Sequence, residues 1–434
     1  MDASSSSSHE SGPRETARPS FAEALRVWLR VGFISFGGPA GQIALLHREV
    51  VEKRRWIDEK RFASALSFCT FLPGPEAQQL ATYIGWSLHG VRGGLASGIL
   101  FFLPAAILLL GLSWLRAAHG DLVVMAGVLY GLRPVVAAIV VDAVLGMVAK
   151  RLTSGARRAV ALLAFLLALA LRVPFPWIIA VAGLAGAALP VFRPVSGTRT
   201  EARPPFAWKT EAIHVARVLF TGVVLGVLPW VALGFIGGSA SFFREVYAFF
   251  IKAAFVTFGG AYAVLTYVSA AAVSEFHWLS RVEMMDGLAL AETTPGPLII
   301  VLEYVGFMAG WNAPGEWSRA GAGALGALLA TYATFLPSLA LVILGAPYVE
   351  RITSIPRLGG GLAAIVAAAT GAIASLGIDF SVAVLLPRGA AGGLDPMAFL
   401  ILAAAFVGLR RRLSLGAVLS LGALLGVLHS LIAR

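Results

Sequence analysis

The residues of this chain that could do chemistry gather in short glycine- and proline-rich motifs that interrupt apolar runs. Toward the N-terminus these motifs read Gly37-Gly38-Pro39-Ala40-Gly41-Gln42 and Pro73-Gly74-Pro75-Glu76-Ala77-Gln78-Gln79, with Thr82 shortly after the second. Proline lacks a backbone donor and clashes with the preceding helical turn, so each motif predicts a break in a helix. The half-helix after a break exposes unpaired N–H groups and the positive end of its dipole, which favour a bound anion. The motifs therefore indicate an anion site built largely from backbone groups.

Both motifs have partners later in the chain. FISFGG at residues 33–38 recurs as FVTFGG at 255–260, and the same offset of 222 aligns Trp56 with Trp278 and Pro73-Gly74-Pro75 with Pro295-Gly296-Pro297. Phe102-Leu103-Pro104 matches Phe335-Leu336-Pro337 after an insertion of eleven residues. Self-similarity at a fixed offset predicts a duplicated structural unit. The candidate binding residues of the second copy are Gly259, Gly260, Thr294, Pro295, Gly296 and Pro297.

Ionisable residues at membrane depth are costly and often functional, so they extend the candidate site. Glu76 falls in the first turn of a half-helix, where it either offsets the dipole or exchanges a proton or ion. Arg133 either neutralises a bound dianion or pairs with a carboxylate on another helix. The second copy has no counterpart of the Glu76-Ala77-Gln78-Gln79 tetrad, so the two half-sites differ. Glu292 and Glu303 leave a cation site open as an alternative.

Enzyme chemistry has little support in the sequence. The seven histidines are scattered and form no metal-ligand pair at helical spacing. No Ser/His/Asp arrangement or phosphate-binding loop is visible, and the one cysteine, Cys69, excludes an intrachain disulfide. We therefore expect no catalytic residues, no metal site and no cofactor, with an intramembrane enzyme as a remote alternative.

The elements that must position these motifs are long apolar helices. Of the 434 residues, 58% are hydrophobic and only 13% are charged, and the mean hydropathy is +0.83. A run of about 20 apolar residues is long enough to cross a bilayer core of ~30 Å. The sequence therefore predicts an all-α polytopic membrane protein. Thirteen apolar segments are expected, near residues 24–46, 62–90, 93–115, 122–149, 158–172, 174–192, 213–236, 245–272, 283–311, 320–345, 358–377, 396–409 and 413–432.

The net charge of +11 has an explanation that does not involve nucleic acid. The basic residues lie mostly in short loops between apolar runs, which is the pattern of the positive-inside rule. We therefore expect the lipid bilayer as a partner and no nucleic acid. A homodimer is left open.

The chain divides into four predicted parts: a disordered cytoplasmic tail, a first repeat, a linker with one extra helix, and a second repeat. Their bounds are 1–20, 21–192, 193–241 and 242–434. One extra crossing before the second copy would invert that copy in the membrane. Loop 47–61 carries six basic residues whereas its counterpart 269–283 carries only Arg281, as inversion requires.

Segments 24–46 and 62–90 pose a problem of topology. If segment 24–46 simply crossed the membrane, the most basic loop would lie outside the cell. Because both segments are broken, each is expected to enter and return on the same side, which puts every strongly basic loop and the N-terminus in the cytoplasm and the C-terminus outside. Thirteen full crossings are the alternative. Broken helices at membrane depth are tolerated only where they are buried or line a cavity.

At these motifs the sequence resembles the chromate ion transporter family. The resemblance rests on residues 36–44, 72–86 and 101–104, and Phe258-Gly259-Gly260 and Thr294-Pro295-Gly296-Pro297 fit the long-chain form with paired domains. It implies export of chromate across the bacterial inner membrane, driven by an ion gradient or by exchange. It also implies sulfate as a competing analogue and two halves of opposite orientation.

We therefore predict a secondary transporter that binds a tetrahedral dianion where the broken helices meet, with the two copies rocking against each other. A sulfate or other oxyanion transporter on the same scaffold is the main alternative, and a cation transporter is a further one. Glu76 is the predicted coupling residue. The predicted binding residues are Gly37, Gly38, Gly41, Gln42, Pro73, Gly74, Pro75, Gln78, Gln79, Thr82, Arg133, Gly259, Gly260, Thr294, Pro295, Gly296 and Pro297.

Overall fold

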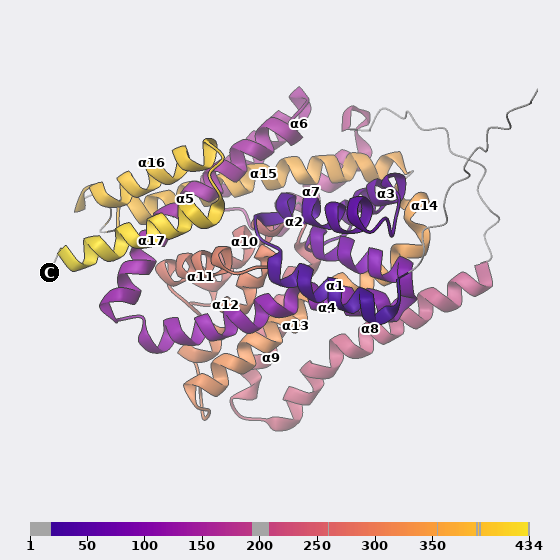
Figure 1. Cartoon of the computed structure of the whole chain (residues 1–434), viewed down its shortest axis with the longest axis horizontal. Coiled ribbons are helices and arrows are strands. Elements are labelled where there is room, and N and C mark those ends of the chain that lie inside the picture. The colour runs from indigo at the N-terminus through magenta and orange to yellow at the C-terminus, as the bar shows by residue number, and fades with distance from the viewer. Residues whose placement is uncertain are drawn as a thin grey trace, which may run out of the picture.

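The computed structural model describes residues 19–432 except 193–207, 259, 354, 388, 390 and 391. Within these residues every regular element is a helix, so the prediction of an all-α protein is confirmed (Figure 1). The predicted tail, apart from its last two residues, and the polar part of the predicted linker lie outside the described residues.

Seven helices make up the first half of the molecule, which we define as residues 21–192. A π-helical turn at Arg48–Lys53 follows the second of them, and a short 3-10 turn at Pro190–Phe192 follows the last. The helices are α1 (Phe21–Ile34), α2 (Gly38–His47), α3 (Glu59–Phe71), α4 (Glu76–His119), α5 (Val123–Arg151), α6 (Gly155–Leu169) and α7 (Phe175–Ala188).

The second half, residues 242–434, repeats this order after the connecting helix α8 (Trp208–Ile236). A π-helical turn again follows the second helix, at Ala271–Glu275, and Arg55 and His277, 222 residues apart, share the same positive φ of 52°. The helices are α9 (Ala240–Val256), α10 (Ala261–Ala270), α11 (Arg281–Thr293), α12 (Val301–Asn312), α13 (Arg319–Gly345), α14 (Val349–Thr353), α15 (Pro356–Leu385), α16 (Pro396–Arg410) and α17 (Leu415–Ile432).

The predicted breaks are present, and the chain doubles back at them. The rings of Trp28 in α1 and Trp56 beyond α2 lie 6.1 Å apart between centroids. The equivalent rings of Phe250 and Trp278 in the second half are also 6.1 Å apart. A continuous helix rises 1.5 Å per residue and would carry such residues roughly 40 Å apart. The first broken segment of each half is therefore a hairpin.

Helix α4 is itself a hairpin. His89 and Gly90 leave helical geometry, with φ of +63° at Gly90. Beyond this kink the backbone of Gly93 packs directly on that of Gly85. A Cβ added to either glycine would lie 2.2–2.4 Å from the carbonyl oxygen of the other. In the second half the corresponding hairpin of α12 and α13 is joined by the loop 313–318, which contains part of the predicted insertion.

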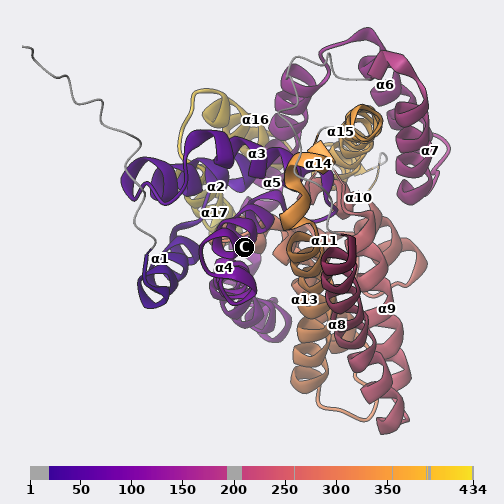
Figure 2. The same cartoon turned by 90° about the vertical axis from the view of Figure 1, so that its right-hand side faces the viewer.

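The two halves interlock. Helix α15 of the second half packs between α6 and α7 of the first, whereas α5 of the first half packs against α16 and α17 of the second (Figure 2). Glycines allow the closest approaches, because Gly131 meets the backbone of Gly422 and Gly186 meets that of Gly360. Small residues at helix contacts are typical of membrane proteins. The core therefore belongs to neither half alone.

Among the described residues, six helices are long and apolar enough to cross a membrane, which confirms a multi-pass membrane protein. One of them, α8, runs along the outside of the bundle beside α9 and α13 (Figure 1). Only 6% of its most apolar 18-residue stretch is buried in the protein. Its exposed Leu, Val and Phe side chains are suited to lipid. The six are α4, α5, residues 212–236 of α8, residues 319–348, α15 and α17.

Candidate anion site at the broken helices

The breaks of the two halves meet and hold each other by reciprocal hydrogen bonds. The amide of Gly74 donates to the carbonyl oxygen of Thr257 at 2.8 Å, and the amide of Gly296 donates to that of Ser35 at 2.7 Å. Gly74 and Gly296 are equivalent under the offset of 222, and so are Ser35 and Thr257. Each proline-glycine-proline turn is therefore fixed by the other half.

Glycine is required at these turns by backbone geometry. Gly74 has a φ of +134° and Gly296 a φ of +111°, values that residues with a Cβ rarely adopt. Gly37, Gly38 and Gly260 have φ of +93°, +66° and +99°. The predicted site residue Gly259 lies outside the described residues.

The four helical segments that start at the breaks lack a side-chain cap. The residues that precede them, Gly37, Pro75, Gly260 and Pro297, have no side chain to accept from the first-turn amides. By contrast, Ser20, Asp58 and Ser280 cap the helices α1, α3 and α11 that lead into breaks. Uncapped first-turn amides need an acceptor from elsewhere. Each such start is therefore a position that favours a negatively charged or accepting group.

Gln42 connects the two halves at this point. Its side-chain nitrogen donates to the carbonyl oxygen of Gly296 at 2.5 Å and to that of Ser35 at 3.5 Å, and the residue is buried. Gly41 packs on the backbone of Phe36, where a Cβ would lie 2.9 Å from the carbonyl oxygen. The structure thus brings Gln42 to the predicted place, with its amide nitrogen occupied.

The Gln78–Gln79–Thr82 cluster is fully buried at the start of α4. Gln78 accepts from Ser338 of α13 at 2.8 Å and donates to Thr82 at 3.1 Å, and Gln79 donates to the carbonyl oxygen of Pro73 at 2.8 Å. The sequence did not single out Ser338, whose partner is 260 residues away. The side-chain amide oxygen Oε1 of Gln79 and the hydroxyl of Ser35 have no hydrogen-bond partner in the described structure, so polar capacity remains free at the breaks.

The second half contributes a different set of polar groups. Thr294 turns its hydroxyl back to the carbonyl oxygen of Ala291 at 2.9 Å, and Pro295 and Pro297 flank the Gly296 turn. The Tyr262 hydroxyl donates to Glu292 at 2.7 Å, and Glu292 is only 7% exposed. The two half-sites are therefore chemically unequal, as the missing tetrad predicts.

Arg133 has a different partner from the one its predicted binding role needs. It donates to Asp286 of α11 through two nitrogens at 2.6 and 3.2 Å, and Arg116 donates to the same carboxylate at 2.8 Å. Asp286 is fully buried, whereas the side chains of Arg116 and Arg133 are 18% and 26% exposed. The cluster retains one net positive charge. Of the two roles left open by the sequence, the structure contains the pairing with a carboxylate on another helix.

Glu76 lies at the start of α4 with an arginine nearby. Its carboxylate is 3.9 Å from the guanidinium of Arg151, and its side chain is 11% exposed. Both the arginine and the amide end of the half-helix stabilise a negative charge there. The coupling role of Glu76 stays a prediction.

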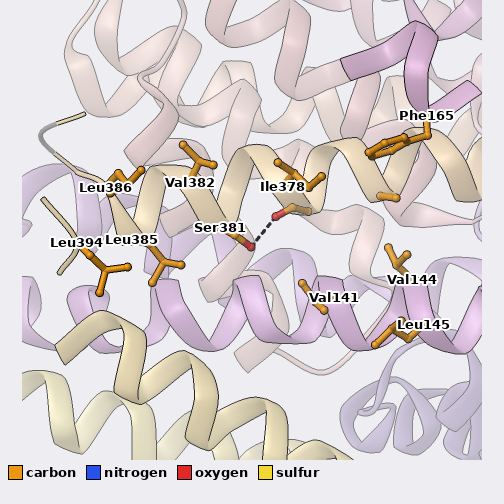
Figure 3. A pocket seen from close by; sticks show the side chains of 12 residues that line it. Val141, Val144, Leu145, Phe165, Ile378, Ser381, Val382, Leu385, Leu386 and Leu394 are labelled. Carbon is orange, nitrogen blue, oxygen red and sulfur yellow. Dashed lines mark hydrogen bonds between the residues drawn. The ribbon is translucent and has the colours of Figure 1, made fainter. Parts of the chain in front are cut away.

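Two cavities of the described structure lie away from the breaks. One of about 380 Å³ between α5 and α15 is lined almost wholly by aliphatic side chains, a poor environment for a dianion (Figure 3). A second, of about 510 Å³, is bordered by α10 and α15 and includes Arg172, Glu275, Arg281 and Asp379. The turns at Gly74 and Gly296 are closely packed in this conformation, whereas a Cβ at Gly38 or Gly260 would meet nothing within 4 Å. Among the described residues no group of three or more His, Cys, Asp or Glu could hold a metal ion.

Broken helices that meet inside a bundle of membrane-crossing helices are typical of secondary transporters, and this fold places the chain among polytopic membrane proteins. The chain belongs to the chromate transporter family, whose profile matches residues 22–187 and 244–427. The resemblance seen in the sequence motifs is thereby confirmed.

Individual relatives extend over most of the chain. It is 28% identical over 376 residues to the chromate transport protein of Cupriavidus metallidurans, covering 86% of this chain and 84% of that protein. It is 31% identical over 368 residues to the chromate transport protein of Pseudomonas aeruginosa, with coverage of 83% and 81%. No solved structure is significantly similar to the chain. These names support a transport protein rather than an enzyme.

Proposed function

We propose that the protein is a secondary transporter that exports chromate across the bacterial inner membrane, driven by an ion gradient or by exchange. Membership of the chromate transporter family supports the substrate. The observation that carries the site is the reciprocal pairing of Gly74 with Thr257 and of Gly296 with Ser35, because it brings four broken segments together. Uncapped amides at that point suit a tetrahedral dianion.

In the proposed bound state the oxyanion accepts from backbone N–H groups of the half-helices and from the side chains of Gln42, Gln78 and Thr82. The amide nitrogen of Gln42 now donates to Gly296, so binding exchanges an internal acceptor for the substrate. Arg133 would contribute through the net positive charge of its cluster with Asp286 and Arg116. Chromate and sulfate share shape and charge, so we expect sulfate to compete.

The proposed topology is two inverted repeats, residues 21–192 and 242–434, joined by residues 193–241. The repeated order of the helices supports this topology. So does the reciprocal packing, in which α15 contacts α6 and α7 of the first half and α5 contacts α16 and α17 of the second. The hairpins at the breaks support re-entrant segments, with the N-terminus in the cytoplasm and the C-terminus outside. Rocking of one repeat against the other would expose the site to each side in turn.

The test is chromate uptake into tight inverted membrane vesicles, with and without a proton gradient and with sulfate as competitor. We expect gradient-dependent accumulation that sulfate reduces. The variants Gln42→Ala and Gln78→Ala should weaken it, whereas Ser414→Ala, in an exposed turn far along the chain, should not. Glu76→Gln tests the predicted coupling residue.

The outcomes separate the alternatives. Accumulation of sulfate with no effect of chromate would assign another oxyanion to the same scaffold. Uptake of a cation in place of either anion would contradict the proposal. Absence of any oxyanion flux in vesicles shown to be tight would also contradict it.

A further inference from the structure

Glu292 is a buried carboxyl group without a cationic partner in the described structure. Its one hydrogen bond there is from the Tyr262 hydroxyl at 2.7 Å, and it is 7% exposed. Asp286, Glu76 and Glu49, the other well-buried acids apart from Glu303, each have an arginine within ion-pair distance. A lone ionised carboxylate at this depth is costly, whereas the protonated acid is not.

The position of the pair links the two breaks of the second half. Glu292 is in the last turn of α11, immediately before the turn at Gly296, and Tyr262 is in the first turn of α10, immediately after Gly260. Their hydrogen bond therefore joins the two broken segments on which the proposed substrate site depends. The equivalent residues of the first half are Ala40 and Thr70, which cannot form such a bond.

One exposed acidic group lies near the pair. Asp142 of α5 interacts electrostatically with Tyr262, and it forms an ion pair at 3.2 Å with Arg410 of α16. The side chains of Asp142 and Arg410 are 36% and 51% exposed. On the helix of Glu292 itself, Asp286 is already neutralised by Arg116 and Arg133. Asp142 is thus a charged group near the pair that is itself partly exposed.

We propose that Glu292, with Tyr262 as its hydrogen-bond donor, is a group that binds and releases a proton coupled to transport, beside the coupling role predicted for Glu76. This proposal rests on the proposed function. On one side of the membrane the carboxylate takes up a proton and becomes the neutral acid, and on the other side the O–H bond breaks and the proton leaves. The loss of charge weakens the link between α10 and α11, and so frees the breaks to move only when a proton is bound.

Glu303 is the matched comparison. It is also buried, at 3% exposure, and its one described hydrogen bond is from Thr331 at 2.8 Å. It lies within the hairpin of α12 and α13, however, and its hydroxyl partner belongs to that same hairpin. A proton on Glu303 would change no contact between the broken segments.

The experiment uses the purified full-length chain in liposomes and two readouts. One is accumulation of chromate driven by a proton gradient, and the other is exchange of chromate against chromate at equal pH on both sides. We expect Glu292→Gln to lose accumulation and pH dependence while it keeps exchange. Glu292→Asp should restore coupling, Tyr262→Phe should shift the pH midpoint of transport upward, and Glu303→Gln should behave as wild type.

Each contrary result has a distinct meaning. Accumulation retained in Glu292→Gln, or exchange lost together with accumulation in a variant that elutes as a folded protein, overturns the role of Glu292. Wild-type exchange that ignores the proton gradient also overturns it, while leaving chromate transport intact. A wild-type protein that supports neither accumulation nor exchange overturns the proposed function itself.

Discussion

Phe102 and Phe335 stack face to face, with ring centroids 3.9 Å apart and ring planes inclined by only 4°. They occupy equivalent positions in the Phe-Leu-Pro motifs of the two halves. When a residue contacts its own equivalent, a twofold relation passes between the two, as in an isologous interface. Under the proposed inverted-repeat topology, the twofold axis would pass through this stacked pair.

Substitution of either stacked ring should have nearly the same effect on stability. Phe102 and Phe335 are 9% and 2% exposed, and Phe→Ala in a core costs about 3–5 kcal/mol. The double variant should cost less than the sum by ~0.5–1.5 kcal/mol, because the shared contact is lost once. Thermal unfolding in detergent measures all three, with the exposed Phe33→Ala as control. Strict additivity would contradict the coupling.

Alanine at Gly74 or Gly296, the glycines of the two proline-glycine-proline turns, should strongly reduce transport with less effect on expression. A Cβ at Gly74 would lie 2.6 Å from Gln79 and 2.9 Å from Ser338, and one at Gly296 would lie 2.6 Å from Ala105. The positive φ adds strain of about 1–3 kcal/mol, enough to reduce transport by roughly tenfold or more. Gly146→Ala is the control, because nothing lies within 4 Å of its added Cβ. Normal chromate flux in Gly74→Ala would show that the turn tolerates a side chain.

Removal of Asp286 should destabilise the protein more than removal of either arginine beside it. Asp286→Ala leaves two guanidinium groups facing each other, and breaking a buried ion pair costs about 3–5 kcal/mol. Arg116→Gln should cost least, because Arg133 keeps both of its bonds to the carboxylate. The order of melting temperatures checks this. If Arg133→Gln instead leaves stability unchanged and raises the KM for chromate, Arg133 binds the substrate directly.

The stability of the basic segment 47–61 should depend on pH through His47. A hydrogen bond to Glu59 at 2.7 Å, aided by Glu52, raises the pKa of His47 above its usual 6.5. The folded state therefore holds the proton more tightly. The interaction of protonated His47 with Glu59 and Glu52 stabilises the folded state fully below pH 6.5. This stabilisation is lost as the pH rises through the higher pKa of His47 in the folded state.

The His47 prediction is checked by melting temperatures of wild type and His47→Gln at several pH values. The difference between the two proteins should be largest in the acid range and should vanish on the alkaline side. Glu59→Gln, which removes the main partner, should flatten the same profile. A difference that grows with pH would contradict the assignment.

The positions of the helices were predictable from the sequence because apolar runs and proline breaks are local signals. The predicted segment 320–345 corresponds to α13 (Arg319–Gly345), and every break falls at its predicted motif. The partner of Arg133 was not predictable, because Asp286 is 153 residues away and only the packing of α5 on α11 brings them together. Ser35 and Thr257 accept through their backbone carbonyl oxygens. Because every residue has such an oxygen, their side chains could not predict this role. The contact of Gly85 with Gly93 could have been suspected from the run of small residues there.

The exchange of partners between α5 and α15 sets an order for biogenesis. Helices leave the ribosome from the N-terminus, so α6 and α7 are inserted long before α15 is made to lie between them, and α5 must wait for α16 and α17 at the very end of the chain. Completion of the core is thus a late, intramolecular event that depends on synthesis of the last helix.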